Sequence, residues 1–190
     1  ERFLRAAASV RNFAPQFHLS LQSGSDRVLK SMNRHYTRAE YLQRCAQIRE
    51  VFPDAAITTD IIAGFPTETE EDFALSLSMV EEAGFSQIHA FPYSPREGTN
   101  AFRKYREIPF AVKKERVERL LEKGAEQKKS YMSRFVGKTL AVVPEAFSRG
   151  FTEGYSENYI RVYIPGDVRG TLVRARAQAL FGDGLRAVKL

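Results

Sequence analysis

Residues 55–94, AAITTDIIAGFPTETEEDFALSLSMVEEAGFSQIHAFPYS, contain two apolar runs separated by an amphipathic helix pattern. The first run is rich in β-branched residues and apolar on both faces, as in a strand buried inside a parallel sheet. Thr69 is placed to cap the helix and Gly84 to end it. The apolar positions of that helix include Phe73, Leu77 and Val80. The stretch therefore predicts a β-α-β unit with parallel strands and a right-handed crossover.

The same alternation extends toward the N-terminus. QFHLSL (16–21) is typical of a strand, and SDRVLKSMN (25–33) predicts a short helix capped by Ser25. Thr37 and Glu40 form a capping-box pattern at the start of a longer helix. The order β-α-β-α-β-α predicts an α/β fold, as half of a barrel or a piece of an open sheet. Because a helical pattern is present from the first residues and no Met precedes it, we expect a fragment.

The pattern of predicted secondary structure changes in the second half of the sequence. Residues 110–135 predict one long charged helix, and from Gly137 onward short β-segments alternate with Gly, Pro and Asp turns. The expected strands are KTLAVVPEA, YIRVYIP, GTLVRARAQALFG and LRAVKL. Such spacing is typical of a small antiparallel barrel. We expect one domain over 1–131 and a second over 132–190.

Charge is distributed unevenly along the chain. The net charge is +6, but residues 1–100 hold 10 Lys/Arg against 13 Asp/Glu, and residues 101–190 hold 19 against 10. A basic second half is typical of a protein that contacts a polyanion such as nucleic acid, although a solvated basic helix is the alternative. The single cysteine, Cys45, excludes a disulfide framework and a multi-cysteine metal site within these residues, and its helical position predicts a buried side chain. No apolar run suggests a membrane span, and we expect a cytoplasmic protein with no membrane partner.

All three predicted strands of the first half end in small or polar residues. The first ends in QSGS (22–25), the second carries Asp60 and ends in GFPTE (64–68), and the third ends in FPYS (91–94). Each could be only a cap, a tight turn or a solvated edge. Because ligands bind at the carboxyl ends of parallel strands, the three together predict a site for a polar nucleoside or amino-acid-like ligand. No metal-ligand spacing is present, and we interpret His18, His35 and His89 as structural.

Three motifs carry a family resemblance: LQSGSDRVLKSMNRHYT, TTDIIAGFPTETEEDF and FPYSPREGT. They resemble the radical-SAM tRNA methylthiotransferases, and GYSENYIRVYIPGD resembles the RNA-binding TRAM module of those enzymes. Together with GFSQIHAFPYSPREGT, it points to the branch acting on N6-threonylcarbamoyladenosine at position 37 of tRNA. The resemblance implies the C-terminal half of a radical-SAM (βα)6 partial TIM barrel, followed by a five-stranded OB-like TRAM barrel.

The resemblance also implies which residues contact S-adenosylmethionine (SAM). The turn at 22–25 and Asp60 would contact its ribose and amino-acid parts, and Arg34 would pair with its carboxylate. Gly64 and the end of the third strand would flank the adenine. The implied cofactor-binding set is Gln22, Ser23, Ser25, Arg34, Asp60, Gly64, Phe91 and Tyr93.

The family's iron–sulfur cysteines are absent from this sequence. The resemblance implies two [4Fe–4S] clusters in the intact parent, with ligands outside this chain, and an electron donor such as flavodoxin or ferredoxin. It implies a 5′-deoxyadenosyl radical that activates C2 of the adenine ring, and a second SAM as methyl donor. We therefore expect no catalytic residue in this chain and no activity of the chain alone. The alternatives are a noncatalytic RNA-binding module and a sibling enzyme that modifies a ribosomal protein.

Basic and aromatic residues of the second half are the expected contacts to the anticodon stem-loop of tRNA. Phosphate contacts combined with aromatic stacking are the usual means of binding unpaired RNA. The alternative for Tyr159 and Tyr163 is a place in the barrel core. The expected RNA-binding set is Lys113, Lys114, Lys128, Lys129, Tyr159, Arg161, Tyr163, Arg174 and Arg176.

Overall fold

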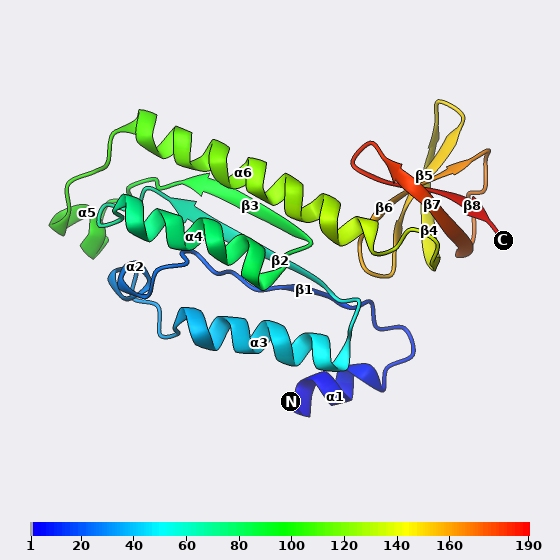
Figure 1. Ribbon diagram of the computed structural model, residues 1–190, viewed down its shortest axis with the longest axis horizontal. Coiled ribbons are helices and arrows are strands. Elements are labelled where there is room, and N and C mark those ends of the chain that lie inside the picture. Colours follow the sequence, from blue (N-terminus) through cyan, green and yellow to red (C-terminus); the bar gives the residue numbers. More distant parts are fainter. Residues whose placement is uncertain (1) are drawn as a thin grey trace. The chain divides into compact units, whose positions relative to one another are not determined.

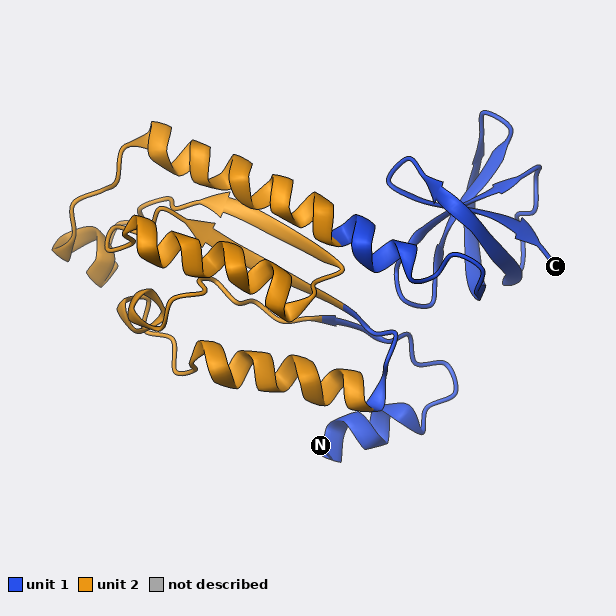
Figure 2. Ribbon diagram, in the orientation of Figure 1, with its two compact units in different colours: residues 1–17, 51–56, 128–190 blue, residues 18–50, 57–127 orange. Residues whose placement is uncertain are grey.

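The computed structural model describes residues 2–190, which form two compact units (Figure 2). Unit 1 comprises the residues up to Phe17, together with Val51–Ala56 and Lys128–Leu190. Unit 2 comprises His18–Glu50 and Ile57–Gln127. Among the described residues, no helix is both long enough and apolar enough to cross a bilayer.

A three-stranded sheet lies mainly in unit 2, in the order β1 (Gln16–His18), β2 (Ala56–Ala63) and β3 (Gln87–Pro92) (Figure 1). β2 and β3 are parallel, with Asp60 opposite His89, which confirms the predicted parallel pairing. The first strand is shorter than predicted. Past His18 the backbone N–H of Leu19 still donates to Thr58 O at 2.9 Å, but that of Leu21 donates to the side-chain Oγ1 of Thr59. An isolated parallel bridge then joins Gln22 to Ile61.

Local capping signals place the helices of unit 2 as expected. The helices are α2 (Asp26–Ser31), α3 (Arg38–Val51) and α4 (Glu70–Ala83). Ser25 caps α2, Thr37 and Glu40 bond reciprocally at the start of α3, and Thr69 forms a capping box with Asp72 on α4. Gly84 ends α4 with φ of 60°. One short helix, α5 (Asn100–Lys104), was not predicted; Thr99 caps it by accepting from Phe102 N–H.

The two faces of the sheet differ in burial. Ile57, Thr59 and Ile61 of β2 are fully buried, whereas the intervening Thr58, Asp60 and Ile62 are half-buried. The buried face is covered by helices: Tyr41 of α3 donates its hydroxyl to Leu19 O at 2.6 Å. Successive residues of a strand point to opposite faces, so the half-buried row forms the open face of the sheet.

Helices α1 (Arg2–Ala8) and α6 (Phe110–Ser133) complete the helical part of the chain, and α6 covers nearly the whole of the predicted 110–135. Within unit 2, α6 packs closely on β3. A Cβ on Gly124 would lie 2.5 Å from Cγ1 of Ile88, closer than carbon atoms can approach. Glycine therefore permits this close contact of helix and strand.

Unit 1 contains a closed five-stranded barrel, as the resemblance implied. Its strands are β4 (Thr139–Ser148), β5 (Phe151–Ser156), β6 (Arg161–Pro165), β7 (Val173–Phe181) and β8 (Gly184–Lys189), in the closed order β4-β5-β6-β8-β7. Alternating apolar side chains such as Val142, Val162 and Leu185 fill its interior. Two details differ from expectation. β5 was not predicted as a strand, since Thr152, Gly154 and Ser156 occupy its inward positions, and the β6–β8 pairing is parallel.

Candidate functional site

A cavity of about 1350 Å³ lies in unit 2 at the carboxyl ends of β2 and β3. Five of the eight expected cofactor-binding residues line it, namely Gln22, Arg34, Asp60, Phe91 and Tyr93. Ser23, Ser25 and Gly64 are not among its lining residues. The structure therefore brings together side chains from all three strand ends and the guanidinium of Arg34.

Gln22 reaches the cavity through an unusual backbone conformation. Its φ is 66°, in the left-handed region, and the residue is almost entirely buried. The backbone N–H of Gln22 donates to Asp60 O at 2.8 Å, and its carbonyl accepts from Ile62 N–H at 2.9 Å. These two bonds to β2 hold the residue in a conformation that side chains disfavour. Such strain is concentrated at functional sites.

The strained position predicts an asymmetric response to substitution. Gln22→Gly is expected to leave the free energy of unfolding within about 1 kcal/mol of wild type, because glycine adopts positive φ freely. Gln22→Val is expected to lower it by about 1–3 kcal/mol, because a β-branched residue is a genuine outlier there. Urea unfolding of both variants measures the difference. Equal stabilities of the two would contradict the assigned conformation.

Asp60 stands on the open face of the sheet, with two polar neighbours from the first strand region. His18 Nε2 lies 3.1 Å from Asp60 Oδ2, and Ser20 Oγ donates to the same oxygen at 3.2 Å. His18 Nδ1 also lies 3.0 Å from Thr58 Oγ1. All contacts use Oδ2, and among the described residues Oδ1 has no hydrogen-bond partner. Sequence reasoning missed His18 and Ser20 as neighbours of Asp60, although their alternation in HLS places both on one strand face.

Arg34 is placed by the end of α2. Asn33 has φ of 59°, Asn33 N–H donates to Lys30 O, and Arg34 N–H donates to Leu29 O. These two bonds form a Schellman motif with Asn33 in the left-handed position, so the helix ends sharply and turns Arg34 toward the cavity. Arg34 is exposed and lines the cavity from the loop that follows α2.

Ser23 and Ser25 are buried in the turn that follows Gln22. Ser25 Oγ donates to Asp72 Oδ1 at 2.6 Å. Partial burial would raise the pKa of Asp72, but hydrogen bonds from Arg27, Ser25 and Thr69 outweigh it and lower that pKa to about 2. Ser25 thus connects the turn after the first strand to the start of α4, whereas the Ser23 hydroxyl accepts from Ser25 N–H within the turn. In this structure neither side chain lines the cavity.

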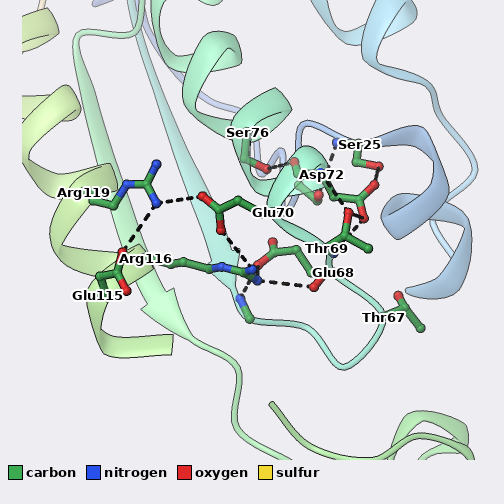
Figure 3. A network of polar contacts seen from close by, with 12 residues as sticks. Ser25, Thr67, Glu68, Thr69, Glu70, Asp72, Ser76, Glu115, Arg116 and Arg119 are labelled. Atoms are coloured by element: carbon green, nitrogen blue, oxygen red, sulfur yellow. Dashed lines mark hydrogen bonds and ion pairs between the residues drawn. The ribbon is translucent and has the colours of Figure 1, made fainter. Parts of the chain in front are cut away.

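Gly64 belongs to a turn that is bonded to a buried ion pair. Gly64 N–H donates to Glu68 Oε2 at 2.7 Å, and Arg116 Nη1 donates to the same oxygen at 2.7 Å (Figure 3). The Glu68 side chain is 1% exposed and that of Arg116 is 7% exposed. Burial raises the pKa of Glu68 despite the hydrogen bond from Gly64 and the Arg116 charge. The turn after β2, which brings Phe65 to the cavity, is therefore anchored on α6.

Lys113, expected among the RNA contacts, is buried inside unit 2, where its side chain bonds to other residues of that unit. It is 3% exposed, its ammonium bonds Glu107 and the carbonyl of Tyr93, and its stem covers Gly64. An RNA strand cannot reach a charge in that position. Lys113 instead holds together the turns that follow β2 and β3.

The rim of the cavity is basic. Its ionisable lining residues are one carboxylate, Asp60, two tyrosines, and five cations: Lys30, Arg34, Arg96, Arg103 and Lys104. Two of the cations lie on α5, the helix that was not predicted. Such a rim attracts an anionic ligand or a phosphodiester. The cavity also exceeds the usual 300–1,000 Å³ of small-ligand pockets, so it has room for more than one small molecule.

The remaining expected RNA contacts are distributed over both units. Lys114, in unit 2, is exposed and lies 3.7 Å from Glu118. In unit 1, Lys129, Arg174 and Arg176 are exposed, and Lys128 is half-buried. Tyr159 is 66% exposed and so lies outside the core. Tyr163 is half-buried, donates its hydroxyl to Asp183 at 2.5 Å and packs against Phe181.

The residues of this chain do not fit an iron–sulfur cluster. Cys45, the single cysteine, is 1% exposed, and burial raises the pKa of its thiol to about 11. A cluster ligand must be a thiolate, so Cys45 is a core residue, as predicted. Across residues 2–190 no group of three or more His, Cys, Asp or Glu side chains is arranged to hold a metal ion.

The donor set does fit the organic part of SAM. Asp60 Oδ1 is an unused acceptor for a hydroxyl or amino group, and Gln22 can both donate and accept. Arg34 offers the planar fork that matches a carboxylate. Ile62, Phe65, Phe91 and Tyr93 give an apolar and aromatic wall suited to a purine, and the rings of Phe65 and Tyr93 meet edge to face at 5.2 Å.

Comparisons with known proteins agree with this architecture. Residues 2–80 match the model of the Radical SAM superfamily. The chain is similar to proteins named tRNA-2-methylthio-N(6)-dimethylallyladenosine synthase. That of Thermus thermophilus is 48% identical over 140 residues, which are 74% of this chain and 30% of the relative. That of Desulfitobacterium hafniense is 37% identical over 193 residues, which are 96% of this chain and 43% of the relative.

A third relative of the same name, from Oceanobacillus iheyensis, is 46% identical over 149 residues, covering 78% of this chain and 29% of the relative. The chain thus spans less than half the length of these relatives. Their names specify a dimethylallyladenosine, whereas the motifs led us to expect a threonylcarbamoyladenosine. The family match and the observed elements fit a partial radical-SAM domain followed by a small closed barrel.

Proposed function

We propose that this chain is part of a radical-SAM enzyme that adds a methylthio group to a modified adenosine of tRNA. The observation that carries the proposal is the cavity at the strand ends, where Asp60, Gln22 and Arg34 face an aromatic wall. Similarity to methylthio-adenosine synthases of tRNA supports the same reaction class. Residues 1–131 would belong to the radical-SAM domain, and residues 132–190 would form the RNA-binding TRAM domain.

In this proposal each cavity residue binds or orients one part of SAM. Asp60 and Gln22 would accept from its ribose hydroxyls and amino group, and Arg34 would pair with its carboxylate. Phe91, Tyr93 and the turn at Gly64 would flank the adenine. Ser23 and Ser25 would stabilise the turn that positions Gln22. SAM supplies radical and methyl-transfer chemistry when bound. The chain's own contribution is to fix the cofactor and to exclude water from its adenine side.

The clusters and the redox partner belong to the rest of the proposed parent. The parent would hold two [4Fe–4S] clusters and receive electrons from a donor such as flavodoxin or ferredoxin. Because the residues of this chain do not fit a cluster, the chain is expected to be inactive by itself in a cytoplasmic setting. Its role is to bind SAM and the anticodon stem-loop of tRNA.

The substrate nucleoside has two candidates. The motifs GFSQIHAFPYSPREGT and GYSENYIRVYIPGD favour N6-threonylcarbamoyladenosine at position 37. The names of the relatives favour a dimethylallyladenosine instead. The two substituents differ strongly in polarity, since one carries a carboxylate and a hydroxyl and the other is a hydrocarbon. The basic rim of the cavity suits the charged substituent, and we therefore retain threonylcarbamoyladenosine as the proposed substrate.

Mass spectrometry of tRNA nucleosides separates these possibilities. In a strain lacking the parent gene, we expect the 2-methylthio form of threonylcarbamoyladenosine to disappear and the unmethylthiolated form to accumulate. Complementation with the intact gene restores it. Loss of the methylthio form of dimethylallyladenosine instead would assign the other substrate. An unchanged nucleoside profile would contradict the proposed activity altogether.

A further inference from the structure

Tyr159, in the turn between β5 and β6, combines two features that are each unfavourable for the stability of the fold. Its φ is 64°, in the left-handed region that disfavours an aromatic residue. Its side chain is also 66% exposed, although burying a tyrosine ring is normally favourable. A turn selected for stability alone would place Gly or Asn here. The position therefore points to a role for the exposed ring.

Buried polar contacts beneath the turn impose this conformation. Asn158 is 2% exposed and Ser156 is 5% exposed. Ser156 Oγ donates to Asn158 Oδ1 at 2.5 Å and accepts from Ile160 N–H at 3.0 Å. Asn158 Nδ2 donates to the hydroxyl of Tyr131 at 3.1 Å. With the residues on both sides fixed in the interior, Tyr159 is presented on the surface in one conformation.

The ring of Tyr159 is part of an aromatic surface. It stacks on Tyr155 with ring centroids 5.1 Å apart and planes inclined by 28°. The guanidinium carbon of Arg161 lies 5.9 Å from the centre of the Tyr155 ring. We call Tyr155, Tyr159 and Arg161 the tyrosine platform. Tyr163, the other tyrosine expected to contact RNA, is not counted in it. Its ring packs against Phe181, and its hydroxyl donates to Asp183, the carboxylate that also pairs with Arg161.

Arginines of neighbouring strands and one carboxylate surround the platform on the barrel surface: Arg161, Arg174 and Glu157, whose Oε2 accepts from Ala141 N–H at 2.8 Å. Tyr155 of β5 is opposite Arg161 of β6 on one side and Val143 of β4 on the other. Next along β4, Ala141 is opposite Arg174 of β7. Ala141 lies two residues along β4 from Val143, so Arg174 belongs to the adjacent cross-strand row of outward side chains, two strands from Tyr155. Among the described residues Arg174 has no ion-pair partner, whereas Arg161 pairs with Asp183 at 3.2 Å.

We propose that the tyrosine platform stacks one unpaired nucleobase of an RNA strand, whose phosphate is held by Arg174. This inference rests on the proposed tRNA-modifying function and specifies where the barrel would bind its substrate. Residues 132–190 carry nine Lys/Arg against five Asp/Glu, so the charge of the barrel favours a polyanion. An exposed ring beside guanidinium groups suits a single-stranded base, because a base inside a duplex has both faces stacked already.

The test uses the full 190-residue chain and two fluorescein-labelled probes: a short single-stranded RNA and a duplex RNA of the same composition. Fluorescence anisotropy gives the Kd of each. Tyr159→Asn removes the ring while supplying a residue that accepts the left-handed backbone. We expect it to weaken single-strand binding by roughly 5- to 150-fold, the range that loss of one base–aromatic stack produces. Duplex binding and the Tm of the chain should not fall.

Three further variants make the result specific. Tyr159→Phe, which keeps the ring, should bind within twofold of wild type. Phe147→Ala removes another exposed aromatic of the barrel, 42% exposed, and should also leave binding unchanged. Arg174→Ala should lower the salt dependence of single-strand binding, reducing the slope of log K against log salt by roughly 0.7 for one lost phosphate contact. Tyr159→Asn should leave that slope as it is.

The outcomes distinguish the platform from the proposed function. If wild type binds the single strand and Tyr159→Asn binds it equally well, the platform is overturned while the tRNA-modifying function stands. Equal weakening of single-strand and duplex binding would also overturn base stacking. If the wild-type chain binds neither probe, the platform is overturned, and the nucleoside profile of the gene-deleted strain then decides the function independently.

Discussion

Replacing Arg116 with alanine is expected to lower the free energy of unfolding of this chain by about 3–5 kcal/mol, because it leaves a buried carboxylate unpaired. The Glu68 side chain is 1% exposed, and among the described residues its Oε2 would accept only from Gly64 N–H once the guanidinium is gone. The Arg116 side chain also lies over the Phe73 ring at 5.3 Å, so its apolar stem is lost from the same region.

Two control variants identify the buried charge as the cause. Arg119 also faces Phe73 and pairs with Glu70 at 2.8 Å, but it is 39% exposed. Arg119→Ala should therefore cost no more than about 1 kcal/mol. Combining Arg116→Met with Glu68→Gln should recover most of the loss, because both charges are then removed. Urea unfolding measures all three, and equal losses for Arg116→Ala and Arg119→Ala would contradict this explanation.

The same pair predicts a pH dependence with a definite sign. Burial raises the pKa of Glu68 above its ordinary value of 4.5, so the folded state binds its proton more tightly than the unfolded state does. Ionised Glu68 therefore costs stability as pH rises above 4.5, and the cost is larger without Arg116. The difference between wild type and Arg116→Ala should shrink when unfolding is measured at about pH 4.5 instead of about pH 7.

Replacing Asp60 with alanine in the intact parent is expected to weaken SAM binding by roughly 10- to 100-fold, because a hydrogen bond to a charged group contributes about 1.5–3 kcal/mol. Asp60 Oδ1 has no partner among the described residues, while Oδ2 is already bonded by Ser20 and lies beside His18. Equilibrium dialysis with labelled SAM measures the affinity, and tRNA binding should not change.

A matched control is available on the barrel. Asp167 is an exposed aspartate whose carboxylate is bonded by Arg169, and Asp167→Ala should leave SAM affinity within twofold of wild type. Asp60→Asn keeps the shape of the side chain and tests the charge alone. Unchanged SAM affinity in both Asp60 variants would mean that the cavity is assigned to the wrong ligand.

The parts of the fold that the sequence predicted depend on local chemistry. Ser25, Thr37 and Thr69 cap their helices because a short hydroxyl side chain reaches backbone N–H groups two or three residues away. Gly84 ends α4 because glycine accepts positive φ. Interactions of this range are fully encoded in neighbouring residues. The parallel order of the strands follows from the helices between them.

The parts that escaped prediction depend on contacts between distant segments. Lys113 looks like a surface cation in its helix, but Glu107 and the carbonyl of Tyr93 surround it in the fold. Glu68 and Arg116 lie 48 residues apart, and nothing in either neighbourhood indicates their pairing. Gln22 adopts positive φ because its backbone bonds β2 on both sides, which no pattern around QSGS reveals. Strand β5 was missed because small polar residues fill its inward positions.

A crystal structure of the intact parent grown with SAM would locate the cofactor in the protein. We expect electron density for SAM in the cavity at the carboxyl ends of β2 and β3, with its ribose or amino group within hydrogen-bond distance of Asp60 and Gln22. Its carboxylate should lie beside Arg34, and its adenine should lie against Phe91 and Tyr93. Density for SAM elsewhere in the protein, with this cavity filled only by water, would show that the cavity is not the SAM site.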